Sequence, residues 1–340
     1  EEATAMIISR TPFRVSFFGG GTDYPIWFRE HGGAVLATTI NKYCYISCRY
    51  LPPFFSHKSR VVWSQIELVQ EREEIQHPVV REALGVLGVS EGIELHHQGD
   101  LPARTGLGSS SAFTVGVLNA LYGLRGVMAG KERLAREAIL IEQERLKEHV
   151  GCQDQVIAAY GGFNRVDFWG EGHFRTSPIM ITWERLNELQ DHLMLFFTGL
   201  SRTASDIAAE QVSVSPQKAR ELRVMHQMVD EAINILKSPH GLGDFGKLLD
   251  EGWQLKRSLT GRISTPYIDE LYERARRGGC TGGKLIGAGG GGFLLLFAPP
   301  ESQAGVAAAL GGLLQVPFRF ESVGSHVIFY ERPDLPPGRL

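Results

Sequence analysis

The sequence predicts an α+β protein built in two lobes. Its 340 residues exceed the size at which a single hydrophobic core usually stops growing, so two domains are expected. Short β-rich runs punctuated by glycine and proline fill the first third of the chain, whereas helical patterns and strands mix later. We place the boundary near residue 185, which divides the chain into lobes of residues 1–185 and 186–340.

The predicted elements follow the apolar pattern along the chain. Short β-rich runs predict strands at residues 6–9, 14–18, 43–49 and 92–98. Apolar residues at helical spacing predict helices at residues 113–124, 131–148, 216–237 and 245–259. Two apolar runs, residues 284–297 and 325–330, close the chain.

The composition is that of a globular enzyme. Hydrophobic residues make up 43% and charged residues 21% of the chain, and the formal net charge is −3. The basic residues form no long run, so we expect no nucleic-acid partner. No apolar run approaches about 18 residues and no signal-peptide pattern opens the chain, so we expect no membrane partner. The four cysteines lack metal-binding spacing and are expected to be reduced core thiols of a cytoplasmic protein.

Two of the three glycine clusters match familiar phosphate-binding patterns only in part. Residues 278–284 fit the start of a Walker A loop, but Leu285 stands where that loop needs Ser or Thr, and an apolar strand follows. Residues 287–292 have the glycine spacing of a dinucleotide-binding motif, but a strand follows where that motif needs a helix. A plain hairpin turn needs fewer glycines. We therefore expect a turn that closely approaches another loop or a ligand, formed by Gly287, Gly289, Gly290 and Gly291.

The third glycine cluster has the features of an anion site at the start of a helix. It runs directly into the helix expected from residue 113, and its members are Gly106, Leu107, Gly108, Ser109, Ser110 and Ser111. Its glycines free backbone N–H groups, and the helix N-terminus adds partial positive charge. An ordinary serine N-cap would explain one serine but not the glycines. We expect this loop to bind phosphate, with its hydroxyls as candidate metal ligands.

Three motifs together resemble the signatures of the GHMP kinases, the group of galactokinase, homoserine kinase and mevalonate kinase. Residues 12–24 are similar to the first signature, near the sugar, and residues 102–112 to the second, which wraps the phosphates of ATP. Residues 284–297 are similar to the third, a glycine turn that supports the phosphate loop. The resemblance implies an N-terminal lobe like ribosomal protein S5 and a ferredoxin-like C-terminal lobe. It also implies ATP and Mg²⁺ as cofactors.

Within this family, the first signature looks most like that of the heptose 7-phosphate kinases. Galactokinases carry Glu-His where this chain has Gly20 and Gly21, which disfavours galactose and leaves space for a longer or phosphorylated sugar. The resemblance implies phosphorylation of the anomeric hydroxyl of D-glycero-D-manno-heptose 7-phosphate to the 1,7-bisphosphate. That product would supply nucleotide-activated heptose for a bacterial surface polysaccharide.

Other functions stay open from the sequence alone. The chain could be another small-molecule kinase of the group, galactokinase-like, fucokinase-like or acting on isoprenoid precursors. It could also be a non-catalytic ligand sensor, but such a protein should have lost Arg14, Ser110, Glu142 or Asp154, and all four are present. The oligomeric state is open, with a homodimer as one option.

The resemblance also implies roles for individual residues. Asp154 would orient the sugar hydroxyl and accept its proton, with Arg14 close by to keep the carboxylate ionised. Ser110 and Glu142 match the positions of magnesium ligands. Each carboxylate also has a structural alternative. Asp154 would only stabilise the start of a helix, and Glu142 would only lie at the rim of an apolar stripe. The candidate substrate-binding residues are Thr11, Gly20, Gly21, Asp23, Arg202, Lys256 and Arg257, of which the last three would bind the sugar phosphate unless they are solvated helix charges.

Overall fold

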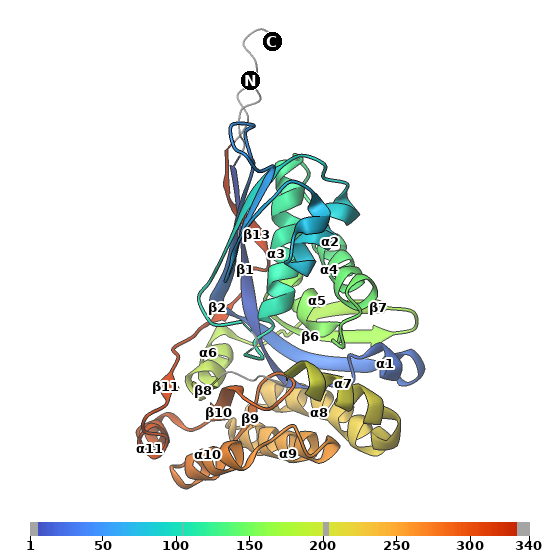
Figure 1. Cartoon of the computed structure of the whole chain (residues 1–340). Coiled ribbons are helices and arrows are strands. Elements are labelled where there is room, and N and C mark those ends of the chain that lie inside the picture. Colours follow the sequence, from blue (N-terminus) through green and yellow to red (C-terminus); the bar gives the residue numbers. More distant parts are fainter. Residues whose placement is uncertain (1–5, 104, 200–203, 332–340) are drawn as a thin grey trace.

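The computed structural model describes residues 6–103, 105–199 and 204–331 and contains two β-sheets with helices packed against them (Figure 1). Within these residues the larger sheet has nine strands and the smaller sheet has four. Helices and strands mix throughout, which confirms the predicted α+β class.

The larger sheet follows the order β13-β1-β2-β5-β3-β4, with β6 and β12 paired to β2 and β7 paired to β6. Its pairs are antiparallel apart from β3 and β5. The strands are β1 (Met6–Phe18), β2 (Gly33–Tyr50), β3 (Ser59–Val62), β4 (Ile66–Val69), β5 (Ile93–Gly99), β6 (Phe163–Trp169), β7 (His173–Pro178), β12 (Phe320–Glu321) and β13 (His326–Tyr330).

The first two predicted strands are one continuous strand, β1, which crosses Pro12. Proline lacks a backbone donor and is tolerated in sheets at bulges and beyond the paired part of a strand. The register with β2 shifts between Pro12 and Phe13, and β13 pairs with β1 only at Ile7 to Arg10. The sequence pattern suggested two strands separated at Pro12. The structure instead has one strand that continues through this residue.

One face of the larger sheet is covered by helices α2 to α5 (Figure 1). The most central is α3, which packs on β1 and β2 and is almost completely buried from Ser111 onwards. The helical segments of this part of the chain are α1 (Pro25–His31), η1 (Arg72–Glu74), α2 (Pro78–Leu87), α3 (Ser109–Leu124), α4 (Lys131–Ile139), η2 (Leu140–Arg145) and α5 (Gln153–Tyr160).

The helix predicted over residues 131–148 ends earlier than expected. It consists of α4 followed by a π-helical turn, η2, and Lys147 has a left-handed backbone with φ 54°. A π turn carries an extra residue, so it changes the direction in which the following side chains point, and such turns are common at functional sites. Glu142, in this turn, is completely buried.

The smaller sheet follows the order β11-β8-β10-β9 and is antiparallel throughout. Its strands are β8 (Leu193–Gly199), β9 (Gly282–Leu285), β10 (Gly292–Phe297) and β11 (Leu314–Gln315). The helical segments around it are α6 (Trp183–Asp191), α7 (Ala204–Val214), η3 (Ser215–Lys218), α8 (Ala219–Lys237), α9 (Gly243–Leu259), α10 (Pro266–Arg277), η4 (Pro300–Ser302) and α11 (Gln303–Ala309).

The two parts of the chain share a core. Phe17 of β1 meets Phe245 of α9 edge-on, with ring centroids 5.7 Å apart, and α8 packs against both β1 and β2. In addition, β12 and β13 return to the larger sheet, so residues 320–330 depart from the division at residue 185. Apolar spacing identifies such a strand but carries no information about which sheet it joins.

All four cysteines are free thiols, and all are buried. Among the described residues, no helix combines the length and the apolar character needed to cross a bilayer.

Candidate active site

A cavity of about 530 Å³ is lined by residues from both parts of the chain. The phosphate loop, the first-signature loop and the segment before α5 contribute from one part, and α7, α9 and the glycine turn between β9 and β10 contribute from the other. The cavity therefore brings together the motifs of residues 12–24, 102–112 and 284–297.

The predicted phosphate loop leads into α3 as expected, but no serine caps the helix. The N-cap is Gly108, which is in a left-handed conformation with φ 71° and has no side chain with which to cap the helix. The first amide groups of a helix lack intrahelical acceptors and attract anions. Ser109 and Ser110 line the cavity at this helix start. The ordinary serine cap is thus excluded, and the anion-binding interpretation is favoured.

The glycine turn packs directly against the phosphate loop, as the sequence predicts for a close approach. A Cβ atom on Gly106 would lie 2.1 Å from the carbonyl oxygen of Ile286, and one on Gly287 would lie 2.3 Å from Cα of Gly106. Neither position has room for a side chain. Further along the turn, the amide of Gly290 donates to the carbonyl of Ile263 at 3.0 Å. The two loops therefore brace each other backbone to backbone.

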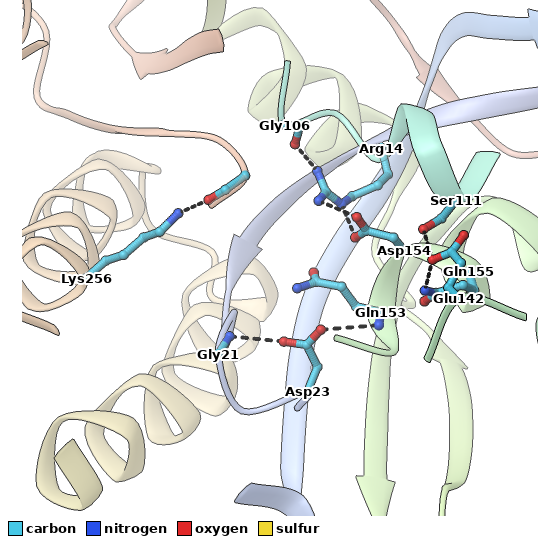
Figure 2. A network of polar contacts seen from close by, with 11 residues as sticks. Arg14, Gly21, Asp23, Gly106, Ser111, Glu142, Gln153, Asp154, Gln155 and Lys256 are labelled. Carbon is cyan, nitrogen blue, oxygen red and sulfur yellow. Dashed lines mark hydrogen bonds and ion pairs between the residues drawn. The ribbon is translucent and has the colours of Figure 1, made fainter. Parts of the chain in front are cut away.

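Arg14 and Asp154 form a bidentate ion pair at the cavity wall (Figure 2). Nε of Arg14 donates to Oδ1 of Asp154 at 2.7 Å, Nη2 donates to Oδ2 at 2.9 Å, and Nη1 donates to the carbonyl of Gly106 at 2.5 Å. The Arg14 side chain is 6% exposed and that of Asp154 is 25% exposed. Each carboxylate oxygen can accept more than one hydrogen bond. The pair is held rigidly, and Asp154 can still accept a proton or a hydrogen bond from a ligand.

Asp23 lies at the cavity beneath the first-signature loop and is almost completely buried. Its oxygens accept from the amides of Gly21 at 3.0 Å and Gln153 at 3.3 Å. Gly151 is required beside it, because a Cβ there would lie 1.9 Å from Oδ2 of Asp23. Burial and the nearby charge of Asp154 raise the pKa of Asp23 above its usual value.

Glu142 lies behind the phosphate loop and does not line the cavity. Its Oε2 accepts from the hydroxyl of Ser111 at 2.9 Å and from the amide of Gln155. The Thr114 hydroxyl also lowers the pKa of Glu142, and Oε1 meets no donor of hydrogen-bond geometry among the described residues. Burial raises the pKa of Glu142 to about 7. A buried carboxylate oxygen without a donor is costly unless a cation meets it, and Mg²⁺ takes carboxylate and hydroxyl oxygens. The donor set thus fits a magnesium ion, although the hydroxyl bonded to Glu142 is that of Ser111 and not that of Ser110.

Two lysines of the second part of the chain line the cavity while being more than nine-tenths buried. Lys256 of α9 donates to the carbonyl oxygens of Leu285, at 3.3 Å, and Gly287. Lys284 of β9 donates to the carbonyl of Phe17 at 3.0 Å. Burial lowers the pKa of Lys256 to about 8 and lowers that of Lys284 well below its usual value.

Two of the predicted substrate-binding residues, Thr11 and Arg257, are not brought to this cavity. Thr11 is buried under α3, where its hydroxyl lies 2.7 Å from that of Ser325, because its side chain points from β1 into the core. Arg257 follows Lys256 on α9 but points elsewhere, and its guanidinium pairs with Asp269 at 3.0 Å. Arg202 lies outside the described residues.

Sequence reasoning missed Lys284 and Gln153 as cavity residues. Lys284 is part of the third signature, yet its exposure to the cavity depends on the long-range contact of β9 with β1. Gln153 precedes Asp154, and its side chain extends into the space between Asp23 and the Arg14–Asp154 pair (Figure 2). Its Oε1 is buried with no partner in the described part of the chain. A glutamine next to a candidate catalytic residue is the only signal that the sequence offers.

The arrangement combines an anion-binding helix start, a carboxylate held by arginine, and buried cations around one cavity. Such a set can hold a triphosphate, orient a hydroxyl group and neutralise charge that develops between them. No group of three or more His, Cys, Asp or Glu side chains able to hold a metal by themselves is found within the described residues. A metal at this site would therefore take most of its ligands from phosphate and water.

Two family descriptions match separate segments of the chain. The description "GHMP kinases N terminal domain" matches residues 73–162, and "GHMP kinases C terminal" matches residues 231–312. The D-glycero-alpha-D-manno-heptose 7-phosphate kinase of Campylobacter jejuni is 28% identical over 321 residues, which are 89% of this chain and 93% of that protein.

Two further relatives extend the comparison. The bifunctional fucokinase/GDP-fucose pyrophosphorylase of Arabidopsis thaliana is 25% identical over 302 residues, which are 82% of this chain but 28% of that protein. The crystal structure of a D-glycero-D-manno-heptose 1-phosphate kinase from Bacteroides thetaiotaomicron superposes with a TM-score of 0.75 at 24% identity, over 94% of this chain and 98% of that chain. This structural likeness shows a shared fold.

Proposed function

The chain belongs to the GHMP kinase family and is a sugar-phosphate kinase, and we propose that its acceptor is D-glycero-D-manno-heptose 7-phosphate. The reaction would transfer the γ-phosphoryl group of ATP to the anomeric hydroxyl and release ADP and the 1,7-bisphosphate. The observation that carries this proposal is the Arg14–Asp154 pair beside the phosphate loop, in a cavity that also exposes two buried lysines. We further propose that the enzyme is cytoplasmic and serves the synthesis of nucleotide-activated heptose.

In the proposed reaction, Asp154 accepts a hydrogen bond from the anomeric hydroxyl and then its proton as the oxygen attacks the γ-phosphorus. Arg14 holds the carboxylate in place through both oxygens. The start of α3 and the glycines of the phosphate loop bind the phosphates of ATP. Positioning and charge neutralisation supply most of the catalysis in phosphoryl transfer. The cavity contains residues of the types needed for these tasks: a carboxylate to accept the proton, an arginine to position it and a glycine-rich loop to bind phosphate.

Glu142 and Ser110 are the residues that we propose to hold Mg²⁺. The unpaired Oε1 of Glu142 supports this role, and Ser110 presents its hydroxyl at the helix start that lines the cavity. When bound, the metal would neutralise charge on the phosphates of ATP. Without the metal, this buried oxygen would meet no donor within the described residues, which is unfavourable.

The preference for a phosphorylated heptose rests on the contents of the cavity. Gly20 and Gly21 line it without side chains, and Gln153 lies beside Gly20, with its Nε2 3.8 Å from where a Cβ would be. Asp23 and Gln153 can bind ring hydroxyls but offer little that distinguishes a hexose from a heptose. Lys256 adds a buried positive charge for a phosphate. The likeness to the Campylobacter heptose 7-phosphate kinase supports the same substrate class.

A fucokinase-like activity is the second candidate, because the fucokinase of Arabidopsis is similar over 82% of this chain. ADP release should be measured with heptose 7-phosphate, free heptose, L-fucose and galactose. The proposed function predicts Mg²⁺-dependent release that is fastest with heptose 7-phosphate. Fastest release with L-fucose would favour the second candidate, and ATP binding without transfer to any sugar would indicate a ligand sensor.

Replacing Glu142 with glutamine is expected to raise the Mg²⁺ concentration needed for half-maximal ADP production about tenfold or more, because the amide is a poor magnesium ligand. The measurement is ADP production as a function of Mg²⁺. Glu144→Gln is the matched control, because Glu144 lies in the same π-helical turn but is exposed. An equal Mg²⁺ requirement in the two variants would contradict the metal role of Glu142.

Replacing Lys256 with methionine is expected to lower kcat/KM for heptose 7-phosphate roughly 10- to 100-fold, since a hydrogen bond to a charged group is worth about 1.5–3 kcal/mol. The value for free heptose should change little. Arg257→Met is the matched control, because its guanidinium pairs with Asp269 outside the cavity. Steady-state kinetics of both variants on both sugars test the assignment. A loss of the same size for both sugars, or in both variants, would contradict it.

A further inference from the structure

Lys284 and Lys256 both line the cavity, and neither makes an ion pair with a carboxylate in the described part of the chain. Both residues are more than nine-tenths buried. The charges that act on Lys284 are those of Lys256, Arg14 and Asp23. Of these, Arg14 is already paired with Asp154.

The hydrogen-bond donors of the two lysines are only partly used. A lysine ammonium carries three N–H donors. Lys284 spends one of them on the carbonyl of Phe17, and Lys256 spends two on Leu285 and Gly287. The remaining donors belong to groups that line the cavity. A buried charge without a partner is costly, and both lysines have a lowered pKa for this reason.

Another part of the cavity has the opposite character. Oε1 of Gln153 is a buried acceptor with no partner in the described residues, and Asp23 presents a carboxyl group close to it. Figure 2 shows Lys256 on one side and the Arg14–Asp154 pair on the other, with Asp23 and Gln153 between them. Unused donors and unused acceptors thus lie on different parts of the wall.

We propose that Lys284 and Lys256 together form the subsite for the phosphate of the acceptor, so that the sugar lies with its phosphate on the lysines and its hydroxyls toward Asp23, Gln153 and Asp154. This inference rests on the proposed function and adds Lys284 as a residue that determines specificity. A phosphate supplies several anionic oxygens, which match the donors that the lysines leave unused. The alternative occupant of the subsite is the γ-phosphoryl group of ATP.

Binding of inorganic phosphate to the nucleotide-loaded protein tests the subsite, because the nucleotide then fills the phosphate loop. Calorimetric titrations should be made on protein saturated with Mg²⁺ and either ADP or the non-hydrolysable analogue AMP-PNP. We expect one phosphate to bind in both states, and Lys284→Met to weaken it about tenfold or more. Lys247→Met is the matched control, since Lys247 is an exposed lysine that pairs with Asp244. It should leave phosphate binding unchanged.

A measurement on the unmodified protein keeps the test valid even if Lys284→Met fails to fold. Sulfate does not titrate near neutral pH, so a change in its affinity with pH reports on the protein. The lysines must be protonated to bind it, and burial lowers their pKa values. Arg14 and Asp23 are the other charged groups that act on both lysines, and burial raises the pKa of Asp23. We therefore expect sulfate affinity to fall as the pH rises through about 8.

The possible results separate this inference from the proposed function. Phosphate binding that is unaffected by Lys284→Met, or sulfate affinity that does not change with pH, overturns the subsite. Phosphate binding to the ADP state but not to the AMP-PNP state overturns it too, because the lysines would then hold the γ-phosphoryl group. A kinase that prefers heptose 7-phosphate without this phosphate site leaves the proposed function standing. A Lys284-dependent site in a kinase that acts only on free sugars contradicts the proposed substrate, and with it the assignment to the acceptor.

Discussion

Replacing Asp154 with asparagine is expected to lower kcat by about 10²–10⁴-fold, the usual contribution of a general base. The amide keeps the size of the side chain and its position in the first turn of α5. It can still accept one hydrogen bond from Arg14 but cannot take the proton of the sugar hydroxyl. Steady-state ADP release with saturating sugar phosphate and ATP measures the effect.

The structural interpretation of Asp154 makes a different prediction for the same variant. Arg14 is buried and would lose one of its two bonds to the carboxylate, so some loss of thermal stability is expected in either case. Binding of Mg²⁺ and AMP-PNP to the variant, together with its melting temperature, shows whether the folded site survives. Normal turnover with a lowered melting temperature would assign Asp154 to a structural ion pair alone.

The second large effect expected is in substrate preference, with kcat/KM for heptose 7-phosphate roughly 10²–10⁴-fold above the values for free heptose and galactose. The loss of two hydrogen bonds to charged groups, at about 1.5–3 kcal/mol each, accounts for a factor of this size. The glycines at positions 20 and 21 leave little to distinguish the sugars at the ring itself. Discrimination must therefore come from the phosphate end. If the unmodified enzyme had comparable kcat/KM values for free and phosphorylated heptose, this explanation would be contradicted, whatever the variants did.

The sequence predicted the fold class and the meeting of the glycine loops because both depend on local rules. A tight backbone approach leaves no room for a Cβ, so the glycines at positions such as Gly106 and Gly287 are themselves the sequence signal of the contact. A helix directly after this loop was likewise predicted, but α3 begins at Ser109 and not at residue 113, so the three serines belong to its first turn. The end of α4 was not predicted, because a π turn has no signature in apolar spacing.

The cavity wall of the second lobe could not be predicted, because it depends on how helices and strands are rotated against each other. Successive residues on a helix point about 100° apart. Lys256 and Arg257 are therefore equivalent in the sequence, yet Lys256 lines the cavity and Arg257 pairs with Asp269. Lys284 reaches the cavity only because β9 meets the end of β1 at Phe17. Contacts between residues so distant in the sequence leave no trace in its periodicity.

The central claim is that the chain transfers a phosphoryl group from ATP to the anomeric hydroxyl of heptose 7-phosphate. The most direct test is a phosphorus and proton NMR spectrum of the product formed from heptose 7-phosphate, ATP and Mg²⁺. We expect a second phosphorus signal coupled to the anomeric proton, with the 7-phosphate retained. A phosphate on any other carbon, or ATP consumption without a new sugar phosphate, would contradict the claim.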